Sequence, residues 1–344
     1  MALPRRIAAV PLVCCAAAVA LAACGGTSGA PGNSATRSGS SSTKARTTHR
    51  SASANASAQL TVTGHAALPA ARTGGAAAAF NSEVVFSGGL SSAATSTATV
   101  FTLTRSGRGA TAGSLPGPVH DAAEAQLGTQ LFLFGGGQSE GGDRIVRVLP
   151  APASVVGRIP QALSDLDAVV VSNVAYVIGG WNGTETSRAI YAAKPTGSSS
   201  GLQVHTVAEL PLGVRYPAAA ALAGRVIVAG GETTSGTPTT AAWSFDPATG
   251  TVTPLPSLPA PTDHAPGAAI NGRFYVLGGL RRGSFTDAIL SWAPGERRWR
   301  TAGRLPSAIS DATAVSLPNA IAVLGGRGAS GAVATVTWLA ARAG

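Results

Sequence analysis

The chain repeats one short motif six times. Each copy is an apolar run that ends in two adjacent glycines, and the first glycine of each pair is Gly88, Gly135, Gly179, Gly230, Gly278 or Gly325. The spacings between these glycines are 47, 44, 51, 48 and 47 residues. A period this regular indicates a repeat architecture, in which each copy folds as one small unit and buries its apolar face against its neighbours.

An apolar residue followed by proline precedes every glycine pair at a constant distance. The apolar residue lies 20 positions before the first glycine and is Leu68, Leu115, Ile159, Leu210, Leu258 or Leu305. Length varies only in the part that follows the glycine pair, as expected if surface loops vary and strands do not. Twenty residues accommodate a turn, a strand, a second turn and a second strand.

The two strands within this constant segment have different compositions. The one that leads into the glycine pair is apolar at nearly every position, as in residues 274–277, which indicates a strand buried on both faces. The one before it is rich in alanine, as in residues 218–221, and small side chains suit a crowded centre. The 44 Gly and 22 Pro of the chain, with 12% charged residues, also favour many short strands. We therefore predict an all-β chain.

Further strands follow each glycine pair, and the fifth copy carries Trp292 and Trp299 there. In this feature the sequence resembles kelch repeats, in which the glycine pair is followed by a Tyr and, seven residues on, by a Trp. The other copies keep one or neither aromatic residue. The resemblance covers residues 59–344. It implies a six-bladed β-propeller of the kelch or galactose-oxidase-like type and says little about activity.

The two ends of the repeat region complement each other. The sixth copy reaches Gly344 soon after residues 334–338, before a fourth strand. Val62 lies six residues before Leu68, at the same offset as the fourth strands of other copies. We therefore expect residues 59–63 to complete the sixth blade and close the ring, because closure removes free sheet edges.

The first residues are typical of an export signal. Arg5 and Arg6 precede an apolar stretch at residues 7–20, and Leu-Ala-Ala leads directly into Cys24. This pattern resembles the lipobox of bacterial lipoproteins, which implies cleavage after residue 23 and a diacylglycerol on the sulfur of Cys24. A plain secretory signal with an accidental cysteine is the alternative. We expect residues 1–23 to be a signal peptide and the protein to be lipid-anchored outside the cytoplasm, on the cell membrane.

Residues 24–58 are predicted to be a tether. From residue 25 on they contain no Asp, Glu, Phe, Tyr or Trp and are rich in Ser, Thr, Gly and Ala, a composition that cannot bury a core. Of the formal net charge of +10, the signal contributes +2, the tether +4 and residues 59–344 the remaining +4. Because the excess lies mostly outside the repeats, we expect no nucleic-acid partner and attribute the charge to attraction toward anionic lipid or wall polymer.

The candidate binding residues come from equivalent positions of the repeats. The fifth and sixth residues after each Leu-Pro or Ile-Pro should ring the mouth of a central channel, and they are Thr73-Gly74, His120-Asp121, Ser164-Asp165, Arg215-Tyr216, Asp263-His264 and Ser310-Asp311. Loops after the glycine pairs add Gln138, Trp181, Glu232, Arg281 and Arg327 to the same face.

We interpret these residues in two ways, as structural turn caps or as ligand-binding residues. We interpret Asp121, Asp165 and Asp311 as turn caps that accept hydrogen bonds from nearby backbone N–H groups. The predicted ligand-binding residues are Arg215, Tyr216, His264, Asp263, Trp181 and His120, since Arg and aromatic side chains are enriched in recognition sites. For several of these an inert surface role stays open.

Several chemistries are not supported. The three cysteines are Cys14, Cys15 and Cys24, so residues 59–344 contain neither a disulfide framework nor a Cys-rich zinc site, nor the Cys–Tyr cofactor of the kelch-type copper oxidases. His120 and His264 come from different repeats without ligand spacing on one element, so we expect no metal site and no cofactor. A glycosidase carboxylate pair is not supported either.

These observations favour a binding protein. We expect a monomeric, non-catalytic binding or scaffolding protein whose propeller face holds a carbohydrate, a cell-wall component or a partner protein. The alternative is a sugar-active enzyme, similar to kelch-type sialate mutarotases, in which His264, Arg215 and Asp263 act as acid–base and orienting groups. A purely structural role in the envelope also stays open.

Overall fold

The computed structural model describes residues 59–104, 107, 109–137, 142–197 and 201–342. The chain divides into residues 1–53 and 54–344, and every described residue belongs to the second unit. The predicted signal peptide, Cys24 and the tether of residues 24–58 lie outside the described residues. The part that is described contains no helix with the length and apolarity needed to cross a membrane.

The prediction of an all-β chain is confirmed, since the regular elements of the described part are β-strands. Most belong to four-stranded antiparallel sheets. The first sheet contains β2 (Ala76–Phe80), β3 (Glu83–Ser87), β4 (Thr97–Leu103) and β5 (Gly109–Val119). The second contains β6 (Ala123–Leu127), β7 (Gln130–Phe134), β8 (Arg144–Leu149) and β9 (Ser154–Arg158). The third contains β10 (Ser164–Val171), β11 (Val174–Trp181), β12 (Ala189–Pro195) and β13 (Leu202–Glu209).

The remaining repeats continue the pattern. The fourth sheet contains β14 (Ala218–Leu222), β15 (Arg225–Ala229), β16 (Ala242–Asp246) and β17 (Thr251–Pro254). The fifth contains β19 (Gly267–Ile270), β20 (Arg273–Leu277), β23 (Ala288–Trp292) and β24 (Arg300–Arg304). The sixth contains β25 (Thr313–Leu317), β26 (Ala320–Leu324), β28 (Gly331–Ala341) and β1 (Leu60–Arg72), and β27 (Arg327–Gly328) pairs with β28. A small separate sheet joins β18 (Thr262–Asp263), β21 (Leu280–Arg281) and β22 (Ser284–Phe285).

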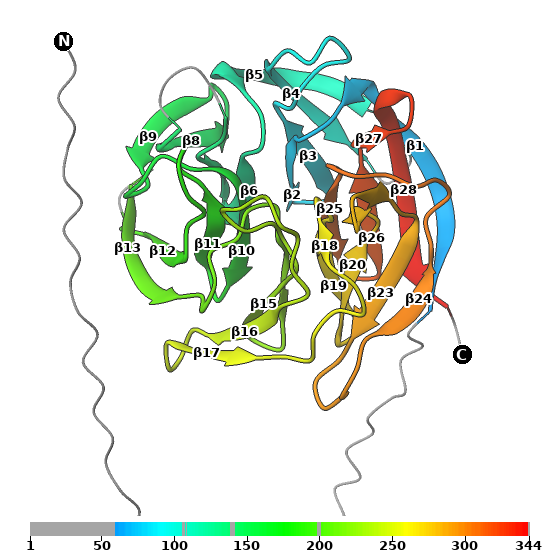
Figure 1. The fold of residues 1–344 in the computed structure, drawn as a ribbon. Helices are drawn as coiled ribbons and strands as arrows, with labels where there is room; N and C mark the ends of the chain where they lie inside the picture. Colours follow the sequence, from blue (N-terminus) through cyan, green and yellow to red (C-terminus); the bar gives the residue numbers. More distant parts are fainter. Residues whose placement is uncertain (1–58, 105–106, 108, 138–141, 198–200, 343–344) are drawn as a thin grey trace, which may run out of the picture. The chain divides into compact units, whose positions relative to one another are not determined.

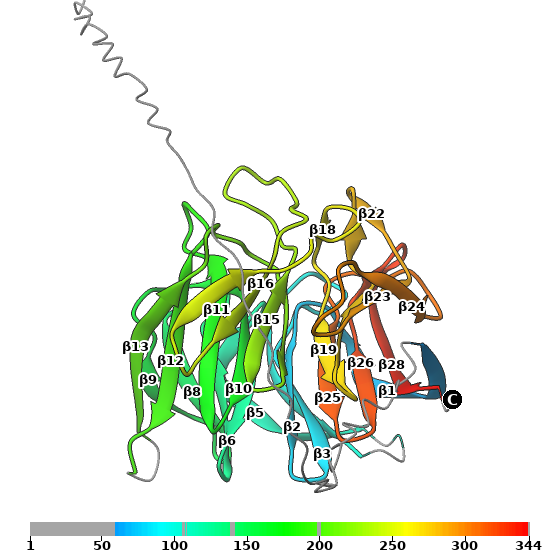
Figure 2. The same cartoon turned by 90° about the horizontal axis from the view of Figure 1, so that it is seen from below.

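The first strands of the sheets contact one another in cyclic order. Strand β2 contacts β6, and the contacts continue through β10, β14, β19 and β25 back to β2. Figure 1 shows these strands near the middle of the ribbon, with β9, β13, β17 and β24 toward the outside. In Figure 2 the strands run between two faces, and β18 and β22 stand at one of them.

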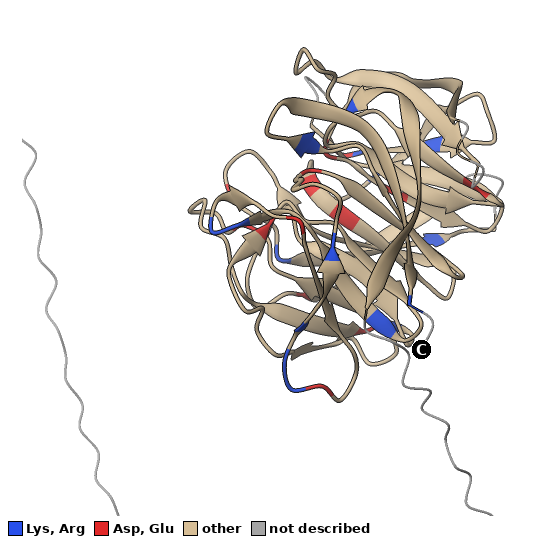
Figure 3. Ribbon diagram, turned by 90° about the vertical axis from the view of Figure 1, so that its right-hand side faces the viewer, with Lys and Arg blue, Asp and Glu red and all other residues tan. Residues whose placement is uncertain are grey.

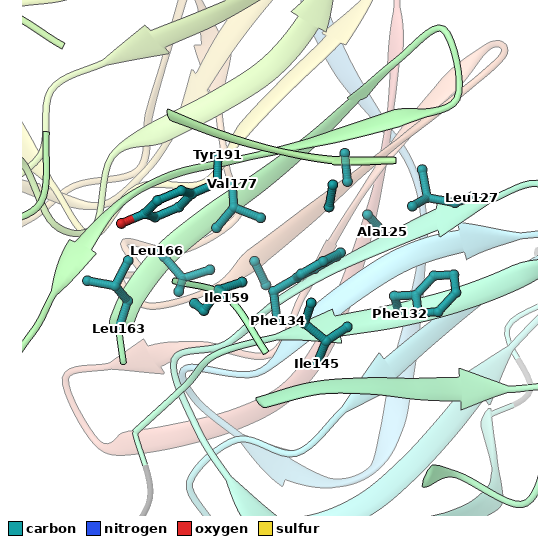
Figure 4. Packing of buried hydrophobic residues seen from close by; sticks show 13 residues of the cluster. Ala125, Leu127, Phe132, Phe134, Ile145, Ile159, Leu163, Leu166, Val177 and Tyr191 are labelled. Atoms are coloured by element: carbon teal, nitrogen blue, oxygen red, sulfur yellow. The ribbon is translucent and has the colours of Figure 1, made fainter. Parts of the chain in front are cut away.

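Apolar side chains fill the spaces between neighbouring sheets. Between the second and third sheets, Phe132, Phe134 and Ile145 pack in one buried cluster with Val177 and Tyr191 (Figure 4). Both faces of β7 and β11 are covered in this way, which explains why their sequences are apolar without alternation. Each such side chain contributes roughly 1.5–3 kcal/mol by its burial.

The glycine pairs join each repeat to the next. The backbone N–H of the second glycine donates to the carbonyl that directly precedes the next pair of predicted mouth residues, over 2.7–2.9 Å. The donor–acceptor pairs are Gly89–Val119, Gly136–Leu163, Gly180–Val214, Gly231–Thr262, Gly279–Ile309 and Gly326–Arg72. A Cβ on the first glycine would lie 2.2–2.7 Å from the same carbonyl oxygen. Glycine is therefore required at the first position of each pair, because two backbones meet there and no side chain fits between them.

The two ends of the described chain lie side by side. Strand β1 pairs antiparallel with β28, with Leu60 opposite Ala341 and Val62 opposite Leu339. Figure 1 shows these strands as adjacent blue and red arrows. Residues separated by most of the sequence are thus joined by backbone hydrogen bonds.

Deleting residues 59–66 should destabilise the whole repeat region. The deletion removes most of the β1–β28 register and leaves β28 with an unpaired edge, so we expect a cooperative loss of several kcal/mol. Thermal unfolding, followed by circular dichroism, measures this loss of stability. Deleting residues 43–50 instead, in the predicted tether, serves as the control and should leave the melting temperature unchanged. An unchanged melting temperature in the first variant would contradict the prediction.

Gly179→Ala should lower the free energy of unfolding much more than Gly272→Ala does. Both glycines have a left-handed backbone, with φ of 66° and 74°, so both substitutions share the cost of about 1 kcal/mol for placing a side chain there. A Cβ at Gly179 would lie 2.5 Å from the Val214 carbonyl oxygen, whereas one at Gly272 meets nothing within 4 Å. We expect urea unfolding to show a further loss of about 2 kcal/mol or more for Gly179→Ala. Equal losses would show that the close approach is unimportant.

Candidate functional site

A cavity of about 410 Å³ runs between the first strands of the sheets. Residues from β2, β6, β10, β14, β19 and β25 line it, and its walls are largely alanine. Its volume lies within the range of small-molecule binding sites.

The predicted mouth positions do come together at this cavity. The second residue of each pair lines it, and these residues are Gly74, Asp121, Asp165, Tyr216, His264 and Asp311. The first residue of each pair instead forms a backbone bridge with the residue that follows a glycine pair. The bridges are Thr73–Leu90, His120–Gly137, Ser164–Trp181, Arg215–Glu232, Asp263–Leu280 and Ser310–Arg327. One constant spacing in the sequence thus places six equivalent residues around one opening.

Backbone hydrogen bonds join five of the six neighbouring pairs of these residues into a belt. Each has a positive φ, between 49° and 60°. The N–H of one residue donates to the carbonyl of its equivalent in the preceding repeat, as Asp121–Gly74 (2.7 Å), Asp165–Asp121 (2.8 Å), Tyr216–Asp165 (2.8 Å), Asp311–His264 (3.0 Å) and Gly74–Asp311 (2.9 Å). Left-handed backbone is unfavourable for residues other than glycine and persists where surrounding bonds hold it, often at functional sites.

Arg215 lies at the centre of a polar and aromatic group on this face. Its Nη2 donates to Glu232 Oε1 over 2.8 Å, and its Nη1 lies 3.6 Å from Asp165 Oδ2. The guanidinium carbon lies 5.1 Å from the ring centre of Trp181 and 5.6 Å from that of Tyr216. Two ion pairs and two cation–π contacts therefore fix its orientation.

Tyr216 and His264 form a stacked pair at the mouth. Their ring centres are 3.8 Å apart, at an angle of 24°. His264 Nδ1 lies 3.3 Å from Asp263 Oδ2, and its Nε2 lies 3.7 Å from Asp311 Oδ1. Burial opposes the charged imidazolium, but the carboxylates of Asp263 and Asp311 outweigh this and raise the pKa of His264.

Carboxyl groups also crowd the mouth, next to Tyr216 and His264. Burial, and then the charges of Asp165 and Asp311, raise the pKa of Asp121 to about 8, although Tyr216 Oη donates to its Oδ2 over 3.3 Å. Burial also raises the pKa of Asp165. The Asp121 carboxylate fits because the neighbouring repeat has Gly74, whose Cβ would lie 2.2 Å from Asp121 Oδ1. In Figure 3 a few acidic segments lie near the middle of the ribbon, and others are spread over it together with the basic ones.

The interpretation of Asp121 and Asp311 as turn caps is wrong. Their side chains contact other side chains at the mouth: Tyr216 donates to Asp121, and Ser310 donates to Asp311. Asp165 faces Arg215. The left-handed backbone explains the difference, because it turns these carboxylates toward the opening.

The other predicted residues lie around the mouth in different ways. His120 Nδ1 lies 2.9 Å from Ser96 Oγ, and its Nε2 lies 3.9 Å from Asp121 Oδ2, behind the residues that line the cavity. Arg327 lies over the Phe285 ring and 3.5 Å from Asp311 Oδ2. Arg281 belongs to β21, next to Asp263 and Thr262 of β18. Gln138 lies outside the described residues.

Two buried acids deeper in the cavity escaped the sequence analysis as site residues. Glu124 accepts a hydrogen bond from Ser87 over 2.7 Å, and burial raises its pKa well above the usual range. Burial raises the pKa of Asp167 to about 7, and it accepts hydrogen bonds from the N–H groups of Ala168 and Ala219. The feature of the sequence that could have identified them is a charged residue within an alanine-rich strand.

This arrangement provides more than one kind of interaction with a ligand. Carboxylates accept hydrogen bonds, Arg215 donates them, and the rings of Trp181, Tyr216 and His264 offer flat faces. A protonated Asp121 would add a donor at neutral pH. Such a surface suits a polar, hydroxyl-rich ligand with some apolar C–H surface.

Asp121→Asn should stabilise the protein at alkaline pH. The pKa of Asp121 is about 8 in the fold and near 3.8 ordinarily, so its ionisation costs the folded state stability as pH rises between these values. Asparagine keeps an acceptor for Tyr216 and carries no charge. We expect the variant to match the wild type near pH 4 and to be more stable by about 2 kcal/mol at pH 9. Urea unfolding across pH measures this.

Asp287→Asn is the matched control, because Asp287 pairs with Arg304, whose side chain is 73% exposed. Its effect should stay within about 0.5 kcal/mol at either pH. If Asp121→Asn showed the same dependence of stability on pH as the wild type, the crowded carboxyl group would not be the cause.

Comparisons with known proteins bear on the fold. The kelch motif matches residues 214–259, the copy that contains Arg215, Tyr216 and Glu232. No curated protein matches the chain by sequence. Among solved structures, the one titled "Structure of YjhT" matches with a TM-score of 0.67 at 17% identity, over 79% of this chain and 95% of that chain. Residues 214–259 thus carry a kelch motif, and the described part of the chain has the fold of a kelch-type propeller.

Proposed function

We propose that the four-stranded sheets are the six blades of a closed kelch-like propeller, in which β1 completes the last blade. The cyclic contacts of the first strands support this architecture. Two hydrogen bonds between the first and last repeats also support it: the Gly74 N–H donates to the Asp311 carbonyl, and the Gly326 N–H donates to the Arg72 carbonyl. A closed ring presents short, protected strand edges to solvent.

We also propose that this propeller, residues 59–344, is held outside the cytoplasm on a lipid-modified Cys24. Residues 1–23 would act as the signal peptide and residues 24–58 as the tether. The lipobox-like sequence before Cys24 is the support for this anchor. We propose a monomer that binds no nucleic acid, since its positive charge lies mostly in the signal and tether.

On this proposal, the protein is a non-catalytic binding protein for a carbohydrate, a cell-wall component or a partner protein. The observation that carries it is the convergence of side chains from five repeats at the mouth of one 410 Å³ cavity. Carbohydrate is the ligand class we favour, because carboxylates and Arg215 suit hydroxyl groups while the stacked Tyr216 and His264 suit the C–H face of a sugar ring.

A sugar-active enzyme is the second candidate. Its supporting observation is the position of His264 between Asp263 and Asp311, whose carboxylates raise its pKa, because such an imidazole is suited to take up and release a proton. Asp263 and Arg215 would then orient the imidazole and the substrate. Turnover of sialic acids or related sugars that disappears in His264→Ala would establish this candidate in place of binding alone.

Removing the side chains of Arg215 and Trp181 should strongly weaken ligand capture. We expect Arg215→Ala with Trp181→Ala to weaken retention of soluble cell-wall polysaccharide and peptidoglycan fragments by at least about tenfold, since both side chains belong to the mouth group. The full chain immobilised through its C-terminus is the bait, and bound sugar is measured after washing. Arg188→Ala with Arg304→Ala, two side chains more than half exposed in rim ion pairs, is the control. Equal retention by the mouth variant and the wild type would show that this face does not bind these ligands.

A further inference from the structure

Three potential metal ligands meet between the fourth and fifth repeats. Glu232, Asp263 and His264 each offer one ligand atom, and these atoms lie within 4.8 Å of one another. Glu232 follows a glycine pair, whereas Asp263 and His264 open the next repeat. Only His264 of the three lines the cavity, so the cluster lies behind its wall.

Two buried atoms of this cluster lack hydrogen-bond partners among the described residues. They are Oδ1 of Asp263 and Nδ1 of His264, and the latter lies at ion-pair distance, 3.3 Å, from the other Asp263 oxygen, Oδ2. The Asp263 side chain is 5% exposed, so water does not freely satisfy its Oδ1. The unpartnered Oδ1 thus belongs to a side chain that is already part of the cluster. An unpartnered buried polar group calls for a further ligand at that point.

The backbone holds these side chains in place. The N–H of Gly231 donates to the carbonyl of Thr262 over 2.9 Å, which joins the residues directly before Glu232 and Asp263. Asp263 is also paired with Leu280 of β21. Arg215 Nη2 fixes Glu232 through Oε1, as outer-shell partners commonly orient a metal-binding carboxylate.

We propose that Glu232, Asp263 and His264 bind one divalent transition-metal ion, Zn²⁺ or Mn²⁺. One imidazole and two carboxylates are donors that suit these ions better than Ca²⁺, which prefers oxygen ligands alone. Ligands about 2.0–2.1 Å from an ion in a tetrahedron are roughly 3.3 Å apart. The Asp263–His264 separation of 3.3 Å already matches this edge, and Glu232 offers a third ligand atom within 4.8 Å of both.

The charges around the cluster favour the binding of a cation with moderate affinity. Glu232 and Asp263 carry two negative charges, and Arg215 brings one positive charge against Glu232. We therefore expect the Arg215 charge to weaken cation binding relative to two unpaired carboxylates. Bound there, the ion would link the fourth and fifth repeats and hold His264 in place against Tyr216. The inference does not depend on which ligand the mouth binds.

Metal titration of the full chain tests the site directly. Chelator-treated protein is titrated with Zn²⁺, Mn²⁺ and Ca²⁺ by calorimetry, and melting temperature is measured with and without each ion. We expect one Zn²⁺ or Mn²⁺ per chain with a higher melting temperature, and weaker binding of Ca²⁺. Asp263→Asn and Glu232→Gln should each weaken binding by about 10–100-fold. Asp287→Asn, in the same repeat but paired with Arg304, should leave it unchanged.

A crystal of the wild-type chain soaked in Mn²⁺ or Zn²⁺ gives an answer that does not rely on variants. Anomalous density between Glu232, Asp263 and His264 would support the proposal even if the variants fold poorly. Density at another place, a water molecule in the cluster without metal, or equal ion affinity in Asp263→Asn and the wild type would overturn it.

Discussion

The close approach of one backbone to the next at the glycine pairs is the constraint on which the rest of the structure depends. In the described repeats the second glycine donates to a carbonyl of the following repeat, and the first glycine passes so near that a Cβ would overlap that oxygen. A hydrogen bond at this place cannot form if the chain is held away by side chains. Neighbouring sheets are therefore held at a fixed distance, and apolar side chains such as Phe134 and Val177 fill the space that this distance leaves.

The same contact positions the candidate site. Each accepting carbonyl directly precedes a pair of mouth residues, so the bond that joins the sheets also fixes where those residues stand. Their left-handed backbone then turns five side chains toward a common opening, among them Tyr216 and His264. Crowding follows from this geometry. Carboxyl groups such as Asp121, which would be remote from one another in an extended chain, share a poorly solvated space, and this raises their pKa values.

Most of the repeat pattern could be read in advance, whereas the chemistry of the mouth could be read only in part. The spacing from the proline to the mouth position predicted that Arg215, Tyr216 and His264 would share a face. It did not predict that Tyr216 would stack on His264 or that Arg215 would lie against Trp181, because these contacts depend on side-chain directions across repeats. The closeness of Glu232 to Asp263 was missed for the same reason, and Asp121 was misassigned because its backbone conformation was unknown.

The sequence by itself determined the repeat, its all-β character and the positions at which glycine is required. These follow from local rules, since apolar runs, proline and glycine restrict a chain in any surroundings. Only the tertiary structure decided which acids and bases meet, which remain without a partner, and which backbone residues adopt positive φ. Most of those properties arise between residues of different repeats, such as Tyr216 and His264, so they depend on how one sheet is set against the next and are not written in any single repeat.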